Sequence, residues 1–137
     1  VAISDSKYAI IPDIPKPQLL ASGLEVVGLD KNVNSDYAEL NPLLSPDGKT
    51  LYFSRKNHPE NVGGVNDKED IWYSELGTDG NWQLAKNLTP LNNPGPNFIN
   101  YISSVTPDGK SALVLLGNQY NEKGKMLAGV SVSTNVG

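Results

Sequence analysis

The chain has 137 residues, of which 11 are Lys or Arg and 15 are Asp or Glu, so its formal net charge is −4. A chain with this charge lacks the broad positive field that follows nucleic-acid phosphates, and we expect no nucleic-acid partner. It contains no cysteine, which excludes disulfides and thiolate sites. No segment approaches the ~20 apolar residues of a membrane-spanning helix, so we expect no direct membrane span.

Short strands separated by turns are indicated along most of the sequence. Thirteen Gly and ten Pro punctuate it in small clusters, and no stretch of a dozen residues shows the 3.6-residue period of an amphipathic helix. Hydrophobic residues make up 38% of the chain, which is enough to bury a core. The sequence therefore predicts an all-β fold.

The first 23 residues differ from the rest. Prolines at positions 12, 15 and 17 fix the backbone and remove hydrogen-bond donors, so residues 1–23 are predicted to form an extended Pro-rich linker or surface segment. Leu24–Leu29 is strand-like and holds the place before the first repeat that Gln83–Leu88 holds before the second. We expect it to be the last strand of a preceding sheet.

One five-residue motif occurs twice, as Ser45-Pro46-Asp47-Gly48-Lys49 and as Thr106-Pro107-Asp108-Gly109-Lys110. Pro presets φ, Asp accepts bonds from its own turn, and Gly takes the positive φ, so each copy predicts a hairpin turn and a structural role for its aspartate. Each turn is followed by a strand-like run. The repeated motif therefore indicates a recurring structural unit.

Each hairpin leads into a polar segment and then another strand. In the first unit a loop over 57–69 precedes a strand over 70–76, and the Asp79-Gly80 turn leads to a fourth strand over 82–88. In the second unit a loop over 117–126 precedes a strand over 129–134. The units are thus a four-stranded sheet over 40–88 and an incomplete one over 98–134.

Four-stranded antiparallel sheets that repeat are typical of β-propellers. Ser45–Ser54 and Asp70–Tyr73 resemble the TolB-type, WD-repeat-like β-propeller family, whose repeat combines Ser-Pro-Asp-Gly-Lys, Leu-Tyr-Phe-Ser and Asp-Ile-Trp. The resemblance implies that residues 24–137 are a partial β-propeller of about one and three-quarter blades. A closed ring needs about four to eight blades, so we expect a piece of a longer protein. The alternative is a small β-sandwich complete in itself.

The residues that carry chemistry are few. The one histidine, His58, lies in a polar loop, where a solvated or loop-bonding imidazole is expected, and no catalytic set can be assembled around it. Asn66, Asp67, Glu69 and Asp70 offer oxygen ligands for a hard cation, but we expect them to be solvated and expect neither a metal nor a cofactor. Trp72 is expected in the core and Trp82 at a partly exposed position.

A binding surface is the remaining possibility for function. The long loops of the two units should emerge on the same face of adjacent blades, which predicts a partner-binding rim. Its candidate residues are Arg55, Lys56, His58, Asn118 and Tyr120. The alternative is that both loops are merely solvated connections.

The family resemblance also implies a setting in the cell. Such repeats are found in periplasmic or outer-membrane-associated bacterial proteins, some beside peptidoglycan-binding OmpA-like domains and some linked to type IX secretion. We therefore expect a non-enzymatic scaffold or binding module with a protein partner in an envelope assembly, in which another domain could contact peptidoglycan. The alternative is the non-catalytic propeller of a hydrolase, a peptidase or glycan-processing enzyme, with its active site outside this chain.

Overall fold

A computed structural model describes residue 23 and residues 26–92 and 98–136, and the side chains of residues 117–120 and 126 lie outside this description. The predicted linker over 1–23 falls almost entirely outside it. In the described part, the chain folds into seven β-strands and two single-turn 3-10 helices. None of the helices in this part has the length and apolar character needed to cross a membrane.

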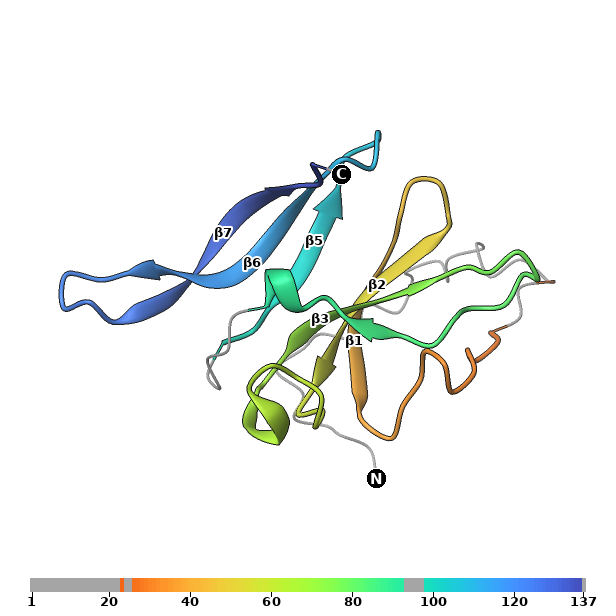
Figure 1. Ribbon diagram of the computed structural model, residues 1–137, viewed down its shortest axis with the longest axis horizontal. Helices are drawn as coiled ribbons and strands as arrows, with labels where there is room; N and C mark the ends of the chain where they lie inside the picture. Colours follow the sequence, from red (N-terminus) through yellow and green to blue (C-terminus); the bar gives the residue numbers. More distant parts are fainter. Residues whose placement is uncertain (1–22, 24–25, 93–97, 137) are drawn as a thin grey trace, which may run out of the picture.

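The strands form two antiparallel sheets (Figure 1). The first sheet has the order β1-β2-β3-β4 and contains β1 (Ala38–Leu44), β2 (Thr50–Lys56), β3 (Asp70–Glu75) and β4 (Lys86–Asn87). The second has the order β5-β6-β7 and contains β5 (Tyr101–Val105), β6 (Ser111–Tyr120) and β7 (Met126–Thr134). The helix η1 (Gly64–Asn66) lies between β2 and β3, and η2 (Thr89–Leu91) follows β4. The predicted all-β fold, with one four-stranded and one three-stranded sheet, is confirmed, and the arrangement is consistent with partial propeller blades.

The two copies of the repeated motif form the same turn. In each copy the aspartate Oδ1 accepts a bond from the hydroxyl of the first turn residue, at 2.6 Å for Asp47 and 2.5 Å for Asp108. The same oxygen accepts the N–H of the following lysine at 3.0 Å in both turns. These bonds lower the pKa of both carboxyl groups below the usual value. The predicted structural role of the two aspartates is confirmed.

The repeat extends beyond the turns. The ladder shifts register between Leu40 and Leu43 in the first hairpin and between Ile102 and Ser104 in the second, a β-bulge at equivalent positions before the turn. The two sheets are therefore copies of one unit, in which the chain runs from a bulged strand through the Pro-Asp-Gly turn into a central strand.

Apolar side chains gather on both faces of the first sheet. On one face, Val33, Phe53, Trp72 and Ala85 form a buried cluster, and partly buried Trp82 packs against it. Between the two sheets, Ile71 of β3 packs with Ile102 of β5 and Val114 of β6. The predicted core position of Trp72, which is 1% exposed, and the partial exposure of Trp82 are both confirmed.

Two element boundaries predicted from the sequence are wrong. The strand expected over 82–88 is reduced to β4, with an isolated bridge between Leu76 and Trp82. Residues 26–29 form no ladder with the two described sheets, and their expected place in a preceding sheet stays a prediction. The loop expected over 117–126 is mostly strand, since β6 continues to Tyr120 and β7 begins at Met126.

The physical reason for this longer hairpin is a turn that the sequence analysis overlooked. The Oδ1 atom of Asn121 accepts the N–H groups of Lys123 and Lys125, and Gly124 supplies a φ of 71°. These contacts close a tight connection of the kind that Asn and Gly favour. The β-ladder can therefore continue as far as the pair formed by Tyr120 and Met126.

Candidate functional site

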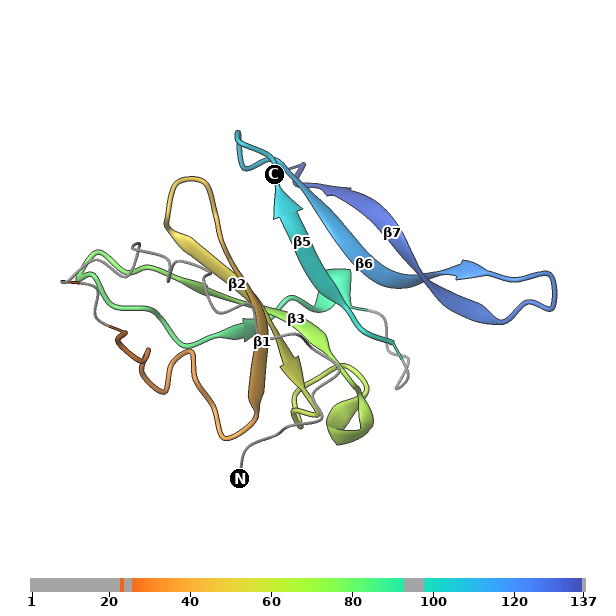
Figure 2. The same ribbon diagram turned by 180° about the vertical axis from the view of Figure 1, so that it is seen from behind.

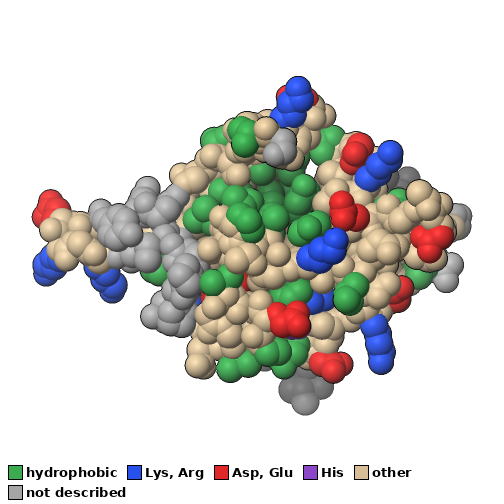
Figure 3. Space-filling view, viewed as in Figure 1, with side chains coloured by type: hydrophobic (Ala, Val, Ile, Leu, Met, Phe, Trp, Pro, Cys, Tyr) green, Lys and Arg blue, Asp and Glu red, His purple; other side chains and the backbone are tan. Residues whose placement is uncertain are grey.

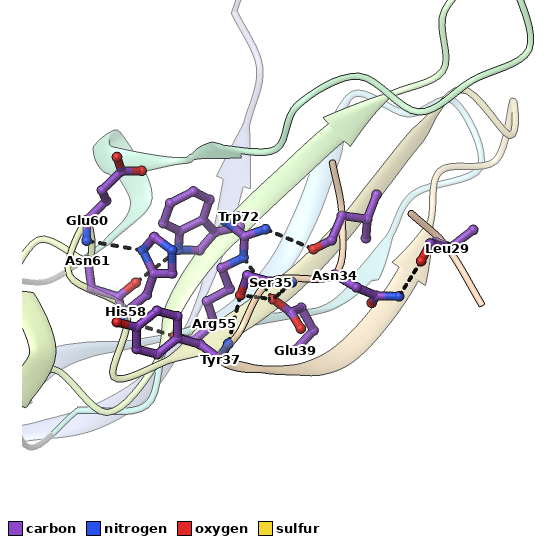
Figure 4. A network of polar contacts seen from close by, with 11 residues as sticks. Leu29, Asn34, Ser35, Tyr37, Glu39, Arg55, His58, Glu60, Asn61 and Trp72 are labelled. Atoms are coloured by element: carbon purple, nitrogen blue, oxygen red, sulfur yellow. Dashed lines mark hydrogen bonds and ion pairs between the residues drawn. The ribbon is translucent and has the colours of Figure 1, made fainter. Parts of the chain in front are cut away.

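Arg55 lies at the centre of a polar network on the first sheet (Figure 4). Its Nε donates to Glu39 at 3.1 Å, and its Nη2 donates to the Val33 carbonyl at 2.8 Å. The guanidinium group stacks over the Trp72 ring, 4.3 Å from the centroid, an arrangement that adds cation–π attraction. Glu39 is held in turn by the backbone N–H and hydroxyl of Ser35. The network ties the segment before β1 to the face of the sheet.

This environment corrects the expected place of Arg55. The residue belongs to β2 rather than to a loop, and it is only 4% exposed. Burial lowers its pKa, while the carboxylate of Glu39 opposes that effect and keeps the guanidinium paired. Arg55 therefore stabilises the fold, and a partner could reach it only after the network had opened.

His58 lies against the same network and is half-buried. Its ring packs edge-on between those of Tyr37 and Trp72, with centroids 4.9 and 4.7 Å away. Its Nδ1 accepts the Glu60 N–H at 3.1 Å, which confirms the expected loop-bonding imidazole. Burial, reinforced by the charge of Arg55, lowers the pKa of His58 from its ordinary value.

The other candidate residues do not join this region. Lys56 is exposed at the end of β2, whereas Asn118 and Tyr120 belong to β6, in the hairpin that projects away from the 57–69 loop in both views (Figures 1 and 2). The joint rim expected from the two loops is therefore absent, because its second loop is a strand pair. Partner binding by the individual residues stays a prediction.

The loop over 57–69 is ordered around two buried carboxylates. Asp67 accepts the Gly63 N–H at 2.9 Å, and Asp70 accepts the Val62 N–H at 2.6 Å and the Asn87 amide at 2.8 Å. Both aspartates are 0% exposed, so the expectation that this acidic cluster is solvated is wrong. The carboxylates replace a regular ladder by binding backbone donors of the loop.

The pKa of Asp67 is strongly perturbed in this loop. Burial raises the pKa of Asp67 to about 6, the bond from Gly63 opposes this rise, and the charge of Asp70 adds to it. Burial likewise raises the pKa of Glu69, against the charge of Lys56. No group of three or more His, Cys, Asp or Glu side chains within the described ranges could hold a metal ion.

A groove of about 700 Å³ opens between the two sheets. Its apolar lining comes from both sheets and includes Leu88, Leu91 and Val105, while Tyr52 and Tyr73 lie side by side in the ladder of the first sheet. Figure 3 shows hydrophobic side chains gathered in the middle of this face, where the sheets meet. The volume falls within the ~300–1,000 Å³ typical of ligand pockets.

Charged groups stand at the rim of the groove. Glu75 belongs to the first sheet and pairs with Lys86 at 3.6 Å, while Lys110 belongs to the repeated turn of the second sheet. Burial raises the pKa of the Tyr52 hydroxyl, which therefore stays protonated and can both donate and accept. The groove thus combines an apolar floor with a few polar groups at its rim.

The sequence analysis did not single out the groove residues. Tyr52 and Tyr73 alternate with Phe53 and Trp72 along their strands, so period-two alternation places them on the opposite face. That signal was present in the sequence, but it could not indicate that the second sheet leaves this face partly open.

The chain was also compared with known proteins. Family models, curated proteins and solved structures all give no match to it. The function must therefore be argued from the geometry and from the repeat.

Proposed function

We propose that the chain is a non-enzymatic β-propeller module that binds a protein partner within a larger bacterial envelope protein. The single observation that carries this proposal is the open groove between the sheets, which has an apolar floor and a polar rim. The charged side chains of Arg55 and Asp70 hold the fold, since they bind backbone groups of neighbouring segments. The proposed ligand is an extended segment of the partner, whose apolar side chains would fill the groove.

The setting of this proposal comes from the TolB-like repeat. The residues of the Pro-Asp-Gly turn and of β3 support a periplasmic or outer-membrane-associated location, with type IX secretion as one candidate assembly and peptidoglycan contacted through another domain. The intact mass of the native protein tests whether the chain belongs to a larger protein, and a mass well above 14.7 kDa is expected. Fractionation of the host cell tests the location, and recovery in the cytoplasm would contradict it.

Binding in the groove can be tested with a peptide array. Decapeptides with Leu or Val at alternate positions would be screened against the chain, and their affinity measured by fluorescence anisotropy. Ala112→Trp fills the groove from β6, whereas Leu84→Trp adds the same ring at a position outside the lining that is 68% exposed. We expect the first variant to weaken binding at least ~10-fold, a loss of about 1.4 kcal/mol, and the second to bind normally. Equal binding by both variants would refute the groove as the site.

The alternative function is the non-catalytic propeller of a peptidase or glycan-processing enzyme. It is favoured by the same lack of a catalytic set around His58, since the active residues would lie outside this chain. Native protein captured with an antibody would discriminate the two. Cleavage of peptide or glycan substrates would support the hydrolase, whereas a constant partner without turnover would support the scaffold.

A further inference from the structure

The repeated unit does not by itself require the two tyrosines of the groove. Tyr52 and Tyr73 lie directly opposite each other in the ladder between β2 and β3. In the second sheet the same place is held by Leu113 and Val132, which are also direct ladder partners. The two places are equivalent because Tyr52 and Leu113 are each the third residue of the strand that follows the repeated turn. The unit therefore folds with an aliphatic pair at this place.

The hydroxyl groups of these tyrosines are available to a ligand. Both residues line the groove, and the partly buried ring of Tyr52 packs against the apolar cluster between the sheets. Within the part of the chain that the structure describes, neither hydroxyl makes a hydrogen bond. A protonated tyrosine hydroxyl can donate to an oxygen of a ligand. The first sheet thus offers the groove two aromatic rings and two hydrogen-bond donors.

The strands that carry the groove residues leave no free ladder for a ligand. Tyr52, Tyr73 and Ala112 belong to β2, β3 and β6, and each of these strands has a neighbour on both sides. A peptide in the groove therefore cannot join these strands by backbone pairing, as it does where a sheet edge is open. It is held instead by its side chains and by hydrogen bonds to its carbonyl groups.

A polyproline II segment meets these conditions. Its backbone makes no internal hydrogen bonds, so its carbonyl groups can accept from the tyrosine hydroxyls. Proline rings are apolar and carry no N–H, so they can be buried against Leu88, Leu91 and Val105 without leaving a donor unpaired. Grooves lined by aromatic rings recognise such segments, whose fixed conformation limits the entropy lost on binding. A saccharide would instead bring hydroxyl groups to an apolar floor that cannot bond them.

One charged group at the rim is left for a ligand to pair with. Glu75 is already paired with Lys86 at 3.6 Å. Lys110, which comes from the second sheet, is exposed and forms no ion pair with another described residue. An acidic side chain of the ligand would complement this charge, and complementary charges favour one partner over others.

We infer that the groove binds a proline-rich segment in the polyproline II conformation, with an acidic residue that pairs with Lys110. This inference rests on the proposed function of the groove and names the class of its ligand. The first sheet supplies the rings and donors, and the second sheet supplies the cation. The proline rings would cover the hydrophobic surface that Figure 3 shows where the two sheets meet.

Three labelled decapeptides test the class of ligand by fluorescence anisotropy. The first combines Pro-x-x-Pro repeats with one Glu, the second has Ala in place of every Pro, and the third has Leu or Val at alternate positions. We expect the first to bind the chain at least ~10-fold more tightly than the second. Equal binding of these two would overturn the inference.

The third peptide separates this inference from the proposed function. Binding of the third peptide alone, lost in Ala112→Trp, would overturn the polyproline II ligand and leave the groove as a binding site. If none of the three peptides binds, the result contradicts the proposed function as well.

Exchange of the tyrosines for the pair in the second unit tests their role. The double variant Tyr52→Leu with Tyr73→Val recreates the pair formed by Leu113 and Val132, so it should keep its fold, which circular dichroism would verify. We expect it to bind the proline peptide at least ~10-fold more weakly than the wild type. Tyr37→Leu, at a position outside the lining that is 41% exposed, is the control and should bind normally. Normal binding by the double variant would refute the role of the tyrosines.

A second pair of substitutions isolates the hydroxyl groups. Tyr52→Phe with Tyr73→Phe keeps both rings and removes both donors, so it tests the inference even if the Leu and Val variant unfolds. Since each lost hydrogen bond costs a fewfold in affinity, this variant should bind the proline peptide at least ~3-fold more weakly. An unchanged affinity would contradict the proposed bonds to the ligand carbonyl groups.

Exchange of charges tests the contact with Lys110. Lys110→Glu should weaken binding of the Glu-containing proline peptide about two- to fivefold, the range expected for an exposed ion pair. The same peptide with Lys in place of Glu should recover this loss. Lys49→Glu changes the equivalent turn lysine of the first unit, which lies outside the lining, and is the matched control. Equal effects of the two substitutions would refute the contact with Lys110.

Discussion

The substitution Asp67→Asn should remove a pH-dependent loss of stability. Asp67 is fully buried and its pKa is raised to about 6 from the ordinary 3.8. An acid with a raised pKa in the folded state favours folding when it is protonated, so its contribution is complete below pH ~4 and is lost as the pH rises through ~6. A shift of about two pKa units corresponds to at most about 3 kcal/mol, and screening at the loop surface reduces the expected loss to about 1–2 kcal/mol.

An asparagine in the same place keeps an oxygen that can accept the Gly63 N–H but carries no charge. As the pH rises from 4 to 7, the free energy of unfolding of the variant should therefore increase by about 1–2 kcal/mol relative to that of the wild type. Urea unfolding, followed by the fluorescence of Trp72 and Trp82, measures this difference. Asp36→Asn, at an exposed position, is the matched control and should track the wild type. A difference between Asp67→Asn and wild type that is the same at both pH values would refute the reasoning.

Three further substitutions probe the same region. Arg55→Ala leaves Glu39 without its cation in a largely buried site and should cost about 3 kcal/mol in urea unfolding, whereas a loss below about 1 kcal/mol would contradict the buried network. Gly63→Ala would place a Cβ 2.9 Å from the Asp67 carboxylate and should cost about 1–3 kcal/mol by the same assay, while an unchanged stability would show that the loop can shift. Trp72→Phe loses the indole N–H bond and part of the stacking on Arg55, so its melting temperature should fall by several degrees, and an unchanged value would argue against that bond.

The turns and the core aromatic residues are the features that the sequence predicts best. A Pro-Asp-Gly turn is specified by contacts within five residues, and both copies form the expected bonds around Asp47 and Asp108. Trp72 was also assigned correctly, because a large aromatic ring in a strand has few favourable positions outside a core. In these cases the local chemistry of the residues decides the outcome.

The polar loop was predicted poorly because burial depends on distant parts of the chain. Arg55 is enclosed by Val33 and Glu39, which come from the segment before β1 and from β1 itself, and Asp70 is reached by Asn87 from β4. A run of charged residues looks solvated until the segments that close over it are known. Period-two alternation could have warned of the error, since Arg55 shares its face with Phe53.

The burial of carboxylates in the 57–69 loop follows from the backbone around them. Asp70 replaces missing backbone partners in that loop, since it accepts the Val62 N–H at 2.6 Å and the Asn87 amide at 2.8 Å. These hydrogen bonds to a charged oxygen offset part of the cost of removing the carboxylate from water.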